Sequence, residues 1–256
     1  MDLGLTGKKF LIGGGSRGLG RAVAEALVAE GAHVMLMSRH EESLKPAAEE
    51  NGSVASYVAV DIADPAAVET VLSAVDAKLG RLDGVLINAG GPPPGEVLKL
   101  TDEQWVGAFE MLIGGPIRLL RALTPKMSDG GAVLFITSSS VRQPIPNLDT
   151  SNVLRPGVAA MAKVLARELG PAVRVNSLAP GRFDTDRVRS LDEGRAKATG
   201  LALEDVQMAS AGQIPLGRYG DPAELGRVGA FLLSPAASYL SGISVQVDGA
   251  LVTAIP

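Results

Sequence analysis

The stretch Gly14-Gly15-Ser16-Arg17-Gly18-Leu19-Gly20 decides the fold, because it stands between an apolar run and a helical pattern. Phe10-Leu11-Ile12 before it predicts a buried strand, and residues 21–29 after it predict an alanine-rich helix. Glycines allow a sharp turn between the two and a close approach of the backbone to a phosphate. The first turn of the helix offers unpaired N–H groups and a partial positive charge. The stretch therefore predicts a site for the pyrophosphate of a dinucleotide.

Strand and helix patterns alternate along the rest of the chain. Near-continuous apolar runs are typical of strands covered on both faces, and they occur at 10–12, 33–37, 54–60, 84–87, 132–137, 173–178 and 243–247. Helical periods lie between them, at 21–29, 41–50, 65–78, 102–127, 158–169 and 222–233, with a break in the fourth left open near Gly114-Gly115-Pro116. These repeats predict an α/β fold, a Rossmann-type doubly wound parallel sheet of about seven strands with helices on both faces.

The length and composition favour one large domain. The chain has 256 residues, of which 46% are hydrophobic and 4% aromatic, and no linker or repeat divides it. We expect a single dinucleotide-binding domain over 1–256, with the polar stretch 183–213 as a lid or substrate-loop excursion. A net charge of -4 provides no basic surface, so we expect no nucleic-acid partner.

The amino-acid types also limit the chemistry and the location. The absence of cysteine excludes disulfides and thiolate nucleophiles, and His33 and His40 lack partners at metal-ligand spacing, so we expect no metal site. No apolar run approaches membrane-spanning length, and residues 1–7 lack the apolar region of a signal peptide. We therefore expect a cytoplasmic protein without a membrane partner.

Several motifs in order resemble the short-chain dehydrogenase/reductase family, over essentially the whole chain. The glycine stretch resembles the glycine motif of that family, although Gly13 stands where a threonine is usual. Asp61-Ile62 resembles the pair that contacts the adenine, and Asn88-Ala89-Gly90 resembles the Asn-Ala-Gly signature. Pro180-Gly181 with Thr185 resembles the segment that holds the nicotinamide carboxamide. In overall pattern the chain is most similar to the 3-oxoacyl-thioester reductases of fatty-acid synthesis.

The resemblance implies a cofactor site, a small-molecule carbonyl substrate and assembly into a homodimer or homotetramer. The residues that it assigns to the cofactor are Gly14, Ser16, Arg17, Gly18, Leu19, Gly20, Ser38, Arg39, Asp61, Ile62, Asn88, Ala89, Gly90, Pro180, Gly181 and Thr185.

The residues after the second strand bear on the choice of cofactor. An NAD site places a carboxylate there to bind the ribose 2′-hydroxyl, but this chain reads Met37-Ser38-Arg39, with no acid before Glu41. Arg39 and Arg17 could instead pair with a 2′-phosphate, because a guanidinium matches phosphate geometry. The alternative is that both are solvated surface charges. We therefore expect NADP(H) more than NAD(H).

The family's catalytic tyrosine, lysine and asparagine are absent at the matching positions. Alignment on the helix Val158–Gly170 places Ser151 at the tyrosine and Arg155 at the lysine, and alignment on Trp105 and Gly115 places Leu112 at the asparagine. The serine of the family remains, as Ser138.

Each replacement has a chemical consequence. A phenol has a pKa of about 10 that a nearby cation can lower, whereas a serine hydroxyl needs an adjacent base. Arg155 keeps the positive charge but cannot act as a base, and Leu112 can neither donate nor accept. The tyrosines, Tyr57, Tyr219 and Tyr239, lie in segments that are not expected to reach the nicotinamide. The standard Ser-Tyr-Lys mechanism is not expected, and the candidate catalytic residues are Ser138, Ser151 and Arg155.

Two local hypotheses accompany this interpretation. Because proline is comfortable only in the first turn of a helix, Pro156 predicts that the helix begins late, near 154–156, and leaves Ser151 outside it; a kinked but continuous helix is the alternative. Arg142, Arg155 and Arg182 could form a cationic site for a carboxylate or phosphate, or they could be structural or solvent-facing.

Two functions remain open. The first is an NADP(H)-dependent oxidoreductase of the 3-oxoacyl or carbonyl reductase type with a non-standard or weakened catalytic site. The second is a catalytically inactive dinucleotide-binding protein that acts as a sensor or scaffold.

Overall fold

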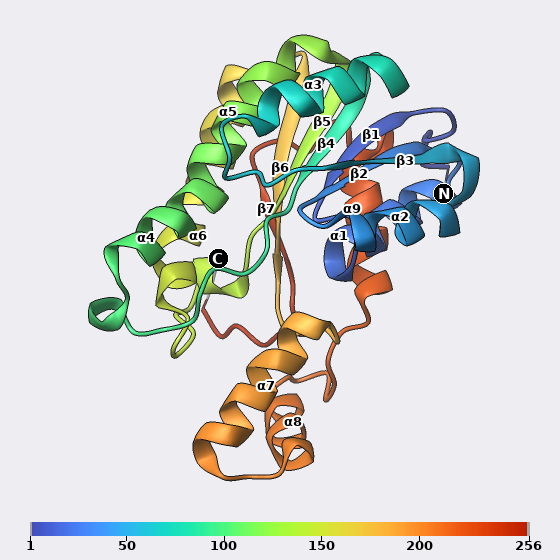
Figure 1. Ribbon diagram of the computed structural model, residues 1–256. Coiled ribbons are helices and arrows are strands. Elements are labelled where there is room, and N and C mark those ends of the chain that lie inside the picture. Colours follow the sequence, from blue (N-terminus) through green and yellow to red (C-terminus); the bar gives the residue numbers. More distant parts are fainter. Residues whose placement is uncertain (1, 255–256) are drawn as a thin grey trace.

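One parallel sheet organises the computed structural model, which describes residues 2–254 (Figure 1). Its strands run in the order β3-β2-β1-β4-β5-β6-β7, and each neighbouring pair is parallel. Their bounds are β1 (Lys9–Gly13), β2 (His33–Ser38), β3 (Ala55–Ala59), β4 (Leu82–Ile87), β5 (Met127–Ile136), β6 (Val173–Pro180) and β7 (Ser244–Val247). The predicted doubly wound α/β sheet is confirmed. Its strand order reverses between β1 and β4, and the crevice at such a reversal is where α/β sheets bind ligands.

Helices cover both faces of this sheet. One layer contains α1 (Gly18–Ala29), α2 (Glu41–Glu50) and α9 (Pro222–Leu233), whose apolar side chains share a buried cluster. The opposite layer contains α3 (Ala67–Lys78), α5 (Gly115–Leu123) and α6 (Asp149–Glu168). Within residues 2–254 no helix is both long enough and apolar enough to cross a membrane.

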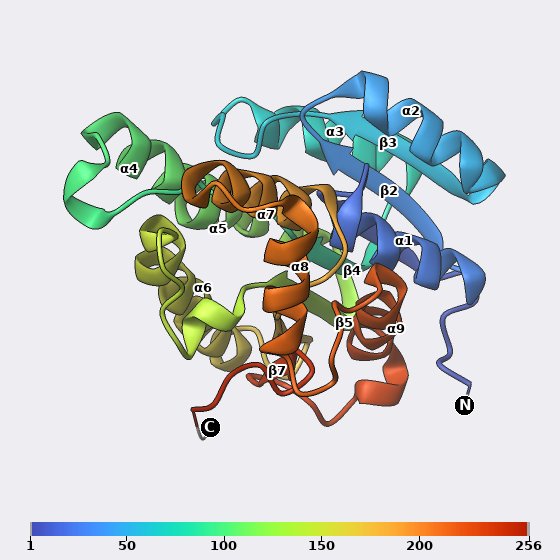
Figure 2. The same ribbon diagram turned by 90° about the horizontal axis from the view of Figure 1, so that it is seen from below.

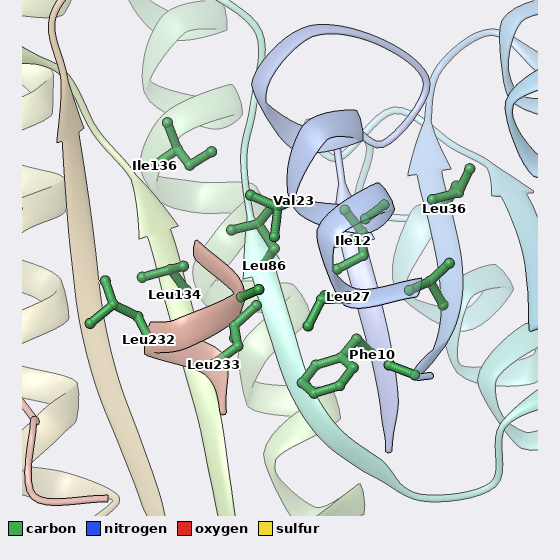
Figure 3. Close-up of a cluster of buried hydrophobic side chains, with 14 of the residues drawn as sticks. Phe10, Ile12, Val23, Leu27, Leu36, Leu86, Leu134, Ile136, Leu232 and Leu233 are labelled. Atoms are coloured by element: carbon green, nitrogen blue, oxygen red, sulfur yellow. The ribbon is translucent and has the colours of Figure 1, made fainter. Parts of the chain in front are cut away.

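Successive residues of a strand supply the two cores. Phe10 and Ile12 face α1 and α9 in the first cluster (Figure 3), while Leu11 faces the second cluster, and all three are at most 1% exposed. Side chains alternate across a strand, so a strand covered on both faces must be apolar at every position. This is why the runs that predicted strands lack polar alternation.

The expectation that α6 begins near Pro156 is wrong. The helix is unbroken from Asp149, includes Ser151, and carries Pro156 in its interior. Contacts outside the helix stabilise its early turns: Thr150 Oγ1 donates to Pro93 O at 2.8 Å, and Asn152 exchanges side-chain hydrogen bonds with the backbone of Ile145. These bonds offset the backbone hydrogen bond that the proline removes.

The helix expected over 102–127 has a widened turn instead of a break. Its parts are α4 (Asp102–Phe109), a π-helical segment Glu110–Gly114, and α5, and Met127 already belongs to β5. A Cβ atom at Gly115 would lie 2.1 Å from Ile62 O, so only glycine allows this close approach to the loop after β3. The wide turn directs Leu112 into the apolar core, where it is 3% exposed.

The stretch 183–213 is mostly helical. It contains α7 (Asp186–Thr199) and α8 (Leu203–Gly212), which lie beyond the carboxyl end of β6, below the sheet in Figure 1. Seen from below, the two helices lie across the middle of the molecule, between α6 and α1 (Figure 2). They therefore lie on the side of the sheet where the parallel strands end.

Candidate functional site

The glycine stretch is closely packed against the end of β4. Gly14 has φ 60°, and a Cβ atom on it would lie 2.6 Å from Asn88 Nδ2. A Cβ atom on Gly20 would lie 2.4 Å from Gly14 O, so α1 begins directly against the loop. Arg17 precedes the helix in extended conformation, and no side chain caps the first turn. The first-turn N–H groups are therefore available to a phosphate, and the loop fits a dinucleotide.

The end of β2 presents polar groups without protein partners. Ser38 Oγ is buried and has no hydrogen-bond partner, as expected of a hydroxyl that binds a ligand. Arg39 is exposed, and no carboxylate of residues 2–254 forms an ion pair with it. Arg17 lies 3.9 Å from Asp186, but both side chains are about two-thirds exposed, so this pair is weak. Both guanidinium groups are accessible to a 2′-phosphate.

The other predicted cofactor residues lie just after the carboxyl ends of β3, β4 and β6 or, as Pro180 does, at such an end. Asp61 is exposed and accepts from Ala63 N at 3.0 Å, which orders the loop after β3. A Cβ atom at Gly90 would meet nothing within 4 Å, so the segment after Asn88 borders open space. A Cβ atom on Gly18 would lie 3.8 Å from Thr185 Cγ2, which places the glycine stretch opposite the segment after β6.

Pro180, Gly181 and Thr185 connect the sheet to α7. Pro180 pairs with Val247 at the end of β6, and Gly181 N donates to Val247 O at 2.9 Å. Thr185 caps α7 by accepting from Val188 N at 3.4 Å. These bonds fix the start of the 183–213 segment beside the carboxyl ends of β6 and β7.

Ser140 lies between the candidate catalytic serines Ser138 and Ser151, where β5 ends. Ser138 Oγ accepts from Ser140 N at 3.0 Å, which caps a short turn and leaves the Ser138 hydroxyl proton free to donate. Ser140 Oγ lies 3.1 Å from Ser151 Oγ in α6, and both residues are buried. Our sequence analysis missed Ser140; its position two residues after Ser138 was the available signal.

Arg155 lies one helical turn after Ser151. Its side chain is nearly covered, with the residue 7% exposed, and Nη1 donates to Ile136 O at 2.6 Å. Burial, together with the positive charge of Arg187, lowers the pKa of Arg155 to about 10. The group stays protonated at neutral pH, so it supplies a fixed positive charge rather than a base.

No tyrosine hydroxyl in the chain bonds to Ser138, Ser151 or Arg155. Tyr57 OH donates to Glu41 at 2.9 Å, and Tyr219 OH donates to Asp192 at 2.9 Å. Tyr239 is fully exposed on the surface. The chain itself therefore places no phenol at the position that Ser151 occupies.

The three arginines considered as a cationic site do not come together. Arg182 forms an ion pair with Asp192 and lies 5.1 Å from the centre of the Tyr219 ring, while Arg142 is exposed. Arg187 of α7 lies instead over Gly91 and donates to Pro92 O, next to the Pro93 carbonyl that Thr150 of α6 contacts, and its positive charge acts on Arg155. Over the described part of the chain, no group of three His, Asp or Glu side chains could hold a metal ion.

Known proteins resemble this chain in sequence and in structure. A family model described as enoyl-(acyl carrier protein) reductase matches residues 14–251. The 3-oxoacyl-(acyl-carrier-protein) reductase of Salmonella typhimurium is 32% identical over 248 residues, 96% of this chain and 97% of that protein.

Solved structures agree. The L-sorbose reductase of Gluconobacter frateurii, complexed with NADPH and L-sorbose, has a TM-score of 0.94 at 32% identity and covers 100% of both chains. A short-chain oxidoreductase of Pseudomonas aeruginosa PAO1, described as containing an atypical catalytic center, has a TM-score of 0.87 at 29% identity, over 97% of this chain and 98% of that one. On these matches, which extend over almost the whole chain, this chain belongs to the short-chain dehydrogenase/reductase family.

Proposed function

We propose that this protein is an NADP(H)-dependent oxidoreductase that reduces a small carbonyl compound at a serine–arginine site. The observation that carries the proposal is the contact between the hydroxyls of Ser140 and Ser151, which are 3.1 Å apart. Ser151 lies one helical turn before Arg155 in α6. The named activities of the relatives, on a 3-oxoacyl group and on L-sorbose, support a small carbonyl compound as the acceptor.

We assign the cofactor to the crevice between β1 and β4. The N–H groups at the start of α1 would bind the pyrophosphate, Arg17 and Arg39 the 2′-phosphate, and Asp61 and Ile62 the adenine. Asn88-Ala89-Gly90, Pro180-Gly181 and Thr185 would hold the nicotinamide half. When bound, NADPH supplies the hydride for the carbonyl carbon. The NADPH-bound L-sorbose reductase supports the phosphorylated nucleotide.

The side chains would stabilise the negative charge that develops on the carbonyl oxygen. Ser138 has a free hydroxyl proton to donate, because its oxygen accepts from Ser140 N. Arg155 contributes a buried positive charge, which acts strongly where water is excluded. The proton would then reach the oxygen from solvent through the hydroxyls of Ser151 and Ser140. This route needs no phenol. It is slower than proton transfer from a phenol, since serine is the weaker acid.

We propose further that residues 183–213 form a lid within a single domain spanning 1–256. Helices α7 and α8 lie beside the crevice, and Asp192, which is buried, anchors them through Arg182 and Tyr219. Exposed apolar side chains on α4 and α6 support assembly into a homodimer or homotetramer; they are Val106, Phe109, Val153 and Val164.

The alternative is a dinucleotide-binding protein without turnover, which acts as a sensor or scaffold. The hydrogen bonds of Tyr57 and Tyr219 to distant carboxylates favour it, because they leave the site without an acid of suitable pKa.

Two measurements separate these functions. Fluorescence titration compares the binding of NADPH with that of NADH, and single-turnover absorbance follows bound NADPH on mixing with 3-oxoacyl thioesters, ketoses, small ketones and oxo acids. The reductase proposal expects tighter binding of NADPH and its oxidation by at least one acceptor. Tight binding without oxidation by any of them would establish the alternative for these classes, and the absence of NADPH binding would contradict both.

A further inference from the structure

Arg155 is a buried cation without a counter-ion. Nε has no hydrogen-bond partner, and Nη1 donates to the neutral carbonyl of Ile136. No carboxylate among residues 2–254 lies within the 4.0 Å that defines an ion pair with it. An uncompensated buried charge is strongly unfavourable, so such a group normally has a partner. The missing partner points to a bound anion.

A second guanidinium approaches the same place from α7. Arg187 reaches over the segment after β4 and donates to Pro92 O at 3.0 Å. A Cβ atom at Gly91 would lie only 2.5 Å from Arg187 Nε, so the guanidinium rests on a position where glycine leaves it room. The neighbouring carbonyl, Pro93 O, accepts from Thr150 of α6. Arg187 therefore lies beside the start of α6, where Ser151 is located, and its side chain remains accessible to solvent.

The carboxylates around these two arginines are engaged elsewhere. Asp149 accepts from Val97 N and from Asn152, while Asp184 pairs with Arg189. Asp186 lies near Arg17 and Arg189. The repulsion between the guanidinium groups also contributes to the lowered pKa of Arg155. The positive charges of Arg155 and Arg187 are thus not neutralised by these carboxylates.

We propose, on the basis of the reductase function above, that the carbonyl substrate carries a carboxylate that binds between Arg155 and Arg187. Two guanidinium groups with free N–H donors suit the planar, two-oxygen geometry of a carboxylate. The carbonyl would then lie toward Ser138 and Ser151, so the acceptor is an oxo acid rather than a neutral ketone. A substrate that enters the site past α7 would contact Arg187.

The position of Arg187 favours the substrate over the phosphates of the cofactor. The glycine stretch and the start of α1 face Thr185, at the N-terminal end of α7. Arg187 contacts Pro92 and Gly91 instead, on the side of α6. A phosphate of the nucleotide as the bound anion is an outcome that the experiment can detect.

The test is calorimetric titration of the protein saturated with NADP⁺, so that no turnover occurs. The probes are pyruvate, 2-oxobutyrate, acetoacetate and levulinate. The control for each acid is its methyl ester, which carries no charge. We expect at least one acid to bind about tenfold or more tightly than its ester, the range of a charge-assisted hydrogen bond. Arg187→Gln should abolish this preference, while Arg195→Gln, which removes an exposed charge from the same helix, should keep it. If every acid binds no better than its ester, or if Arg187→Gln keeps the preference, the proposal is wrong.

A second variant separates charge from position. Gly91→Ala retains both arginines but displaces the Arg187 guanidinium, so it should also lower the preference for the acid, with the fold checked by circular dichroism. An unchanged preference in Gly91→Ala would contradict the assigned place of Arg187. If Arg187→Gln weakens NADP⁺ binding tenfold in a protein that shows no acid preference, the arginines hold a cofactor phosphate and the proposal is overturned. Failure of the wild type to bind NADP⁺ would instead contradict the proposed function.

Discussion

Single side chains distinguish this site from the pattern that it resembles. We assign Ser151 to the position where the family has a phenol, and its hydroxyl bonds to that of Ser140 at 3.1 Å. Arg155 keeps a positive charge one turn later, but with a pKa of about 10 it remains a cation throughout the neutral range. Such a site can polarise a carbonyl group better than it can protonate one.

Ser151→Ala tests the proposed proton route. Removal of the hydroxyl should lower the rate of NADPH oxidation by the best carbonyl acceptor by about 10²-fold, the usual contribution of one positioned proton donor. The dissociation constant of NADPH should not change. Ser73→Ala on the exposed face of α3 is the matched control. An unchanged rate in Ser151→Ala would remove Ser151 from the mechanism.

Leu112→Asn tests the loss of the polar relay. Leu112 is 3% exposed in an apolar cluster, so an amide there would be buried without partners. We expect the free energy of unfolding to fall by about 2–4 kcal/mol in urea denaturation. Leu98→Asn, at a residue that is 96% exposed, should change it little. A stable Leu112→Asn protein would show that the wide turn still accommodates a polar group.

Among the elements, α6 and α7 position the chemistry. Helix α6 carries Ser151 and Arg155 on one face, and α7 carries Arg187 toward them. Asp192 connects α7 to the body of the protein, since it is 1% exposed and binds both Arg182 and Tyr219. Loss of one partner from such a buried network leaves an uncompensated charge.

Asp192→Ala should therefore loosen the proposed lid, residues 183–213, without unfolding the sheet. Hydrogen exchange should become faster for amides of 186–212, while amides of β1, β4 and β5 keep their protection. Glu193→Ala, at the exposed neighbouring position, serves as the control and should exchange like the wild type. Equal protection of α7 in both variants would show that the anchor is unnecessary.

The elements also show where sequence reasoning reached its limit. Strands were predictable because apolar runs such as Phe10–Ile12 must be buried on both faces. The start of α6 was not predictable, because it depends on contacts outside the helix. Thr150 bonds to Pro93, which is distant along the chain, and Asn152 bonds to Ile145, which precedes the helix. Arg187 carried no signal either, since only the fold of α7 brings it to Gly91 and Pro92.

At the scale of the whole molecule, the strand order reverses between β1 and β4, and we propose that the nucleotide binds there with Arg17 and Arg39 on its 2′-phosphate. The glycine motif was predictable because close backbone approaches, such as that of Gly20 to Gly14, exclude any side chain. The family resemblance assigned Ser138, Ser151 and Arg155 to the site, but the hydrogen bond between Ser140 and Ser151 required the packed helix.

The preference for the phosphorylated nucleotide can be measured on the intact protein. At a ligand concentration of 100 times its dissociation constant, binding adds about 2.7 kcal/mol, which corresponds to roughly 5–10 °C in melting temperature. NADPH should produce this shift at a concentration where NADH produces a smaller one. Arg39→Ala should bring the two shifts together, whereas equal shifts in the wild type would indicate that both arginines are only surface charges.

A crystal structure of the NADPH complex tests the central claim most directly. We predict the pyrophosphate against Gly14–Gly20 and the nicotinamide C4 facing Ser138 and Ser151, with no tyrosine hydroxyl from any subunit near it. A phenol beside C4, supplied by a partner copy or by movement of the lid, or a nucleotide bound away from the glycine stretch, would contradict the account.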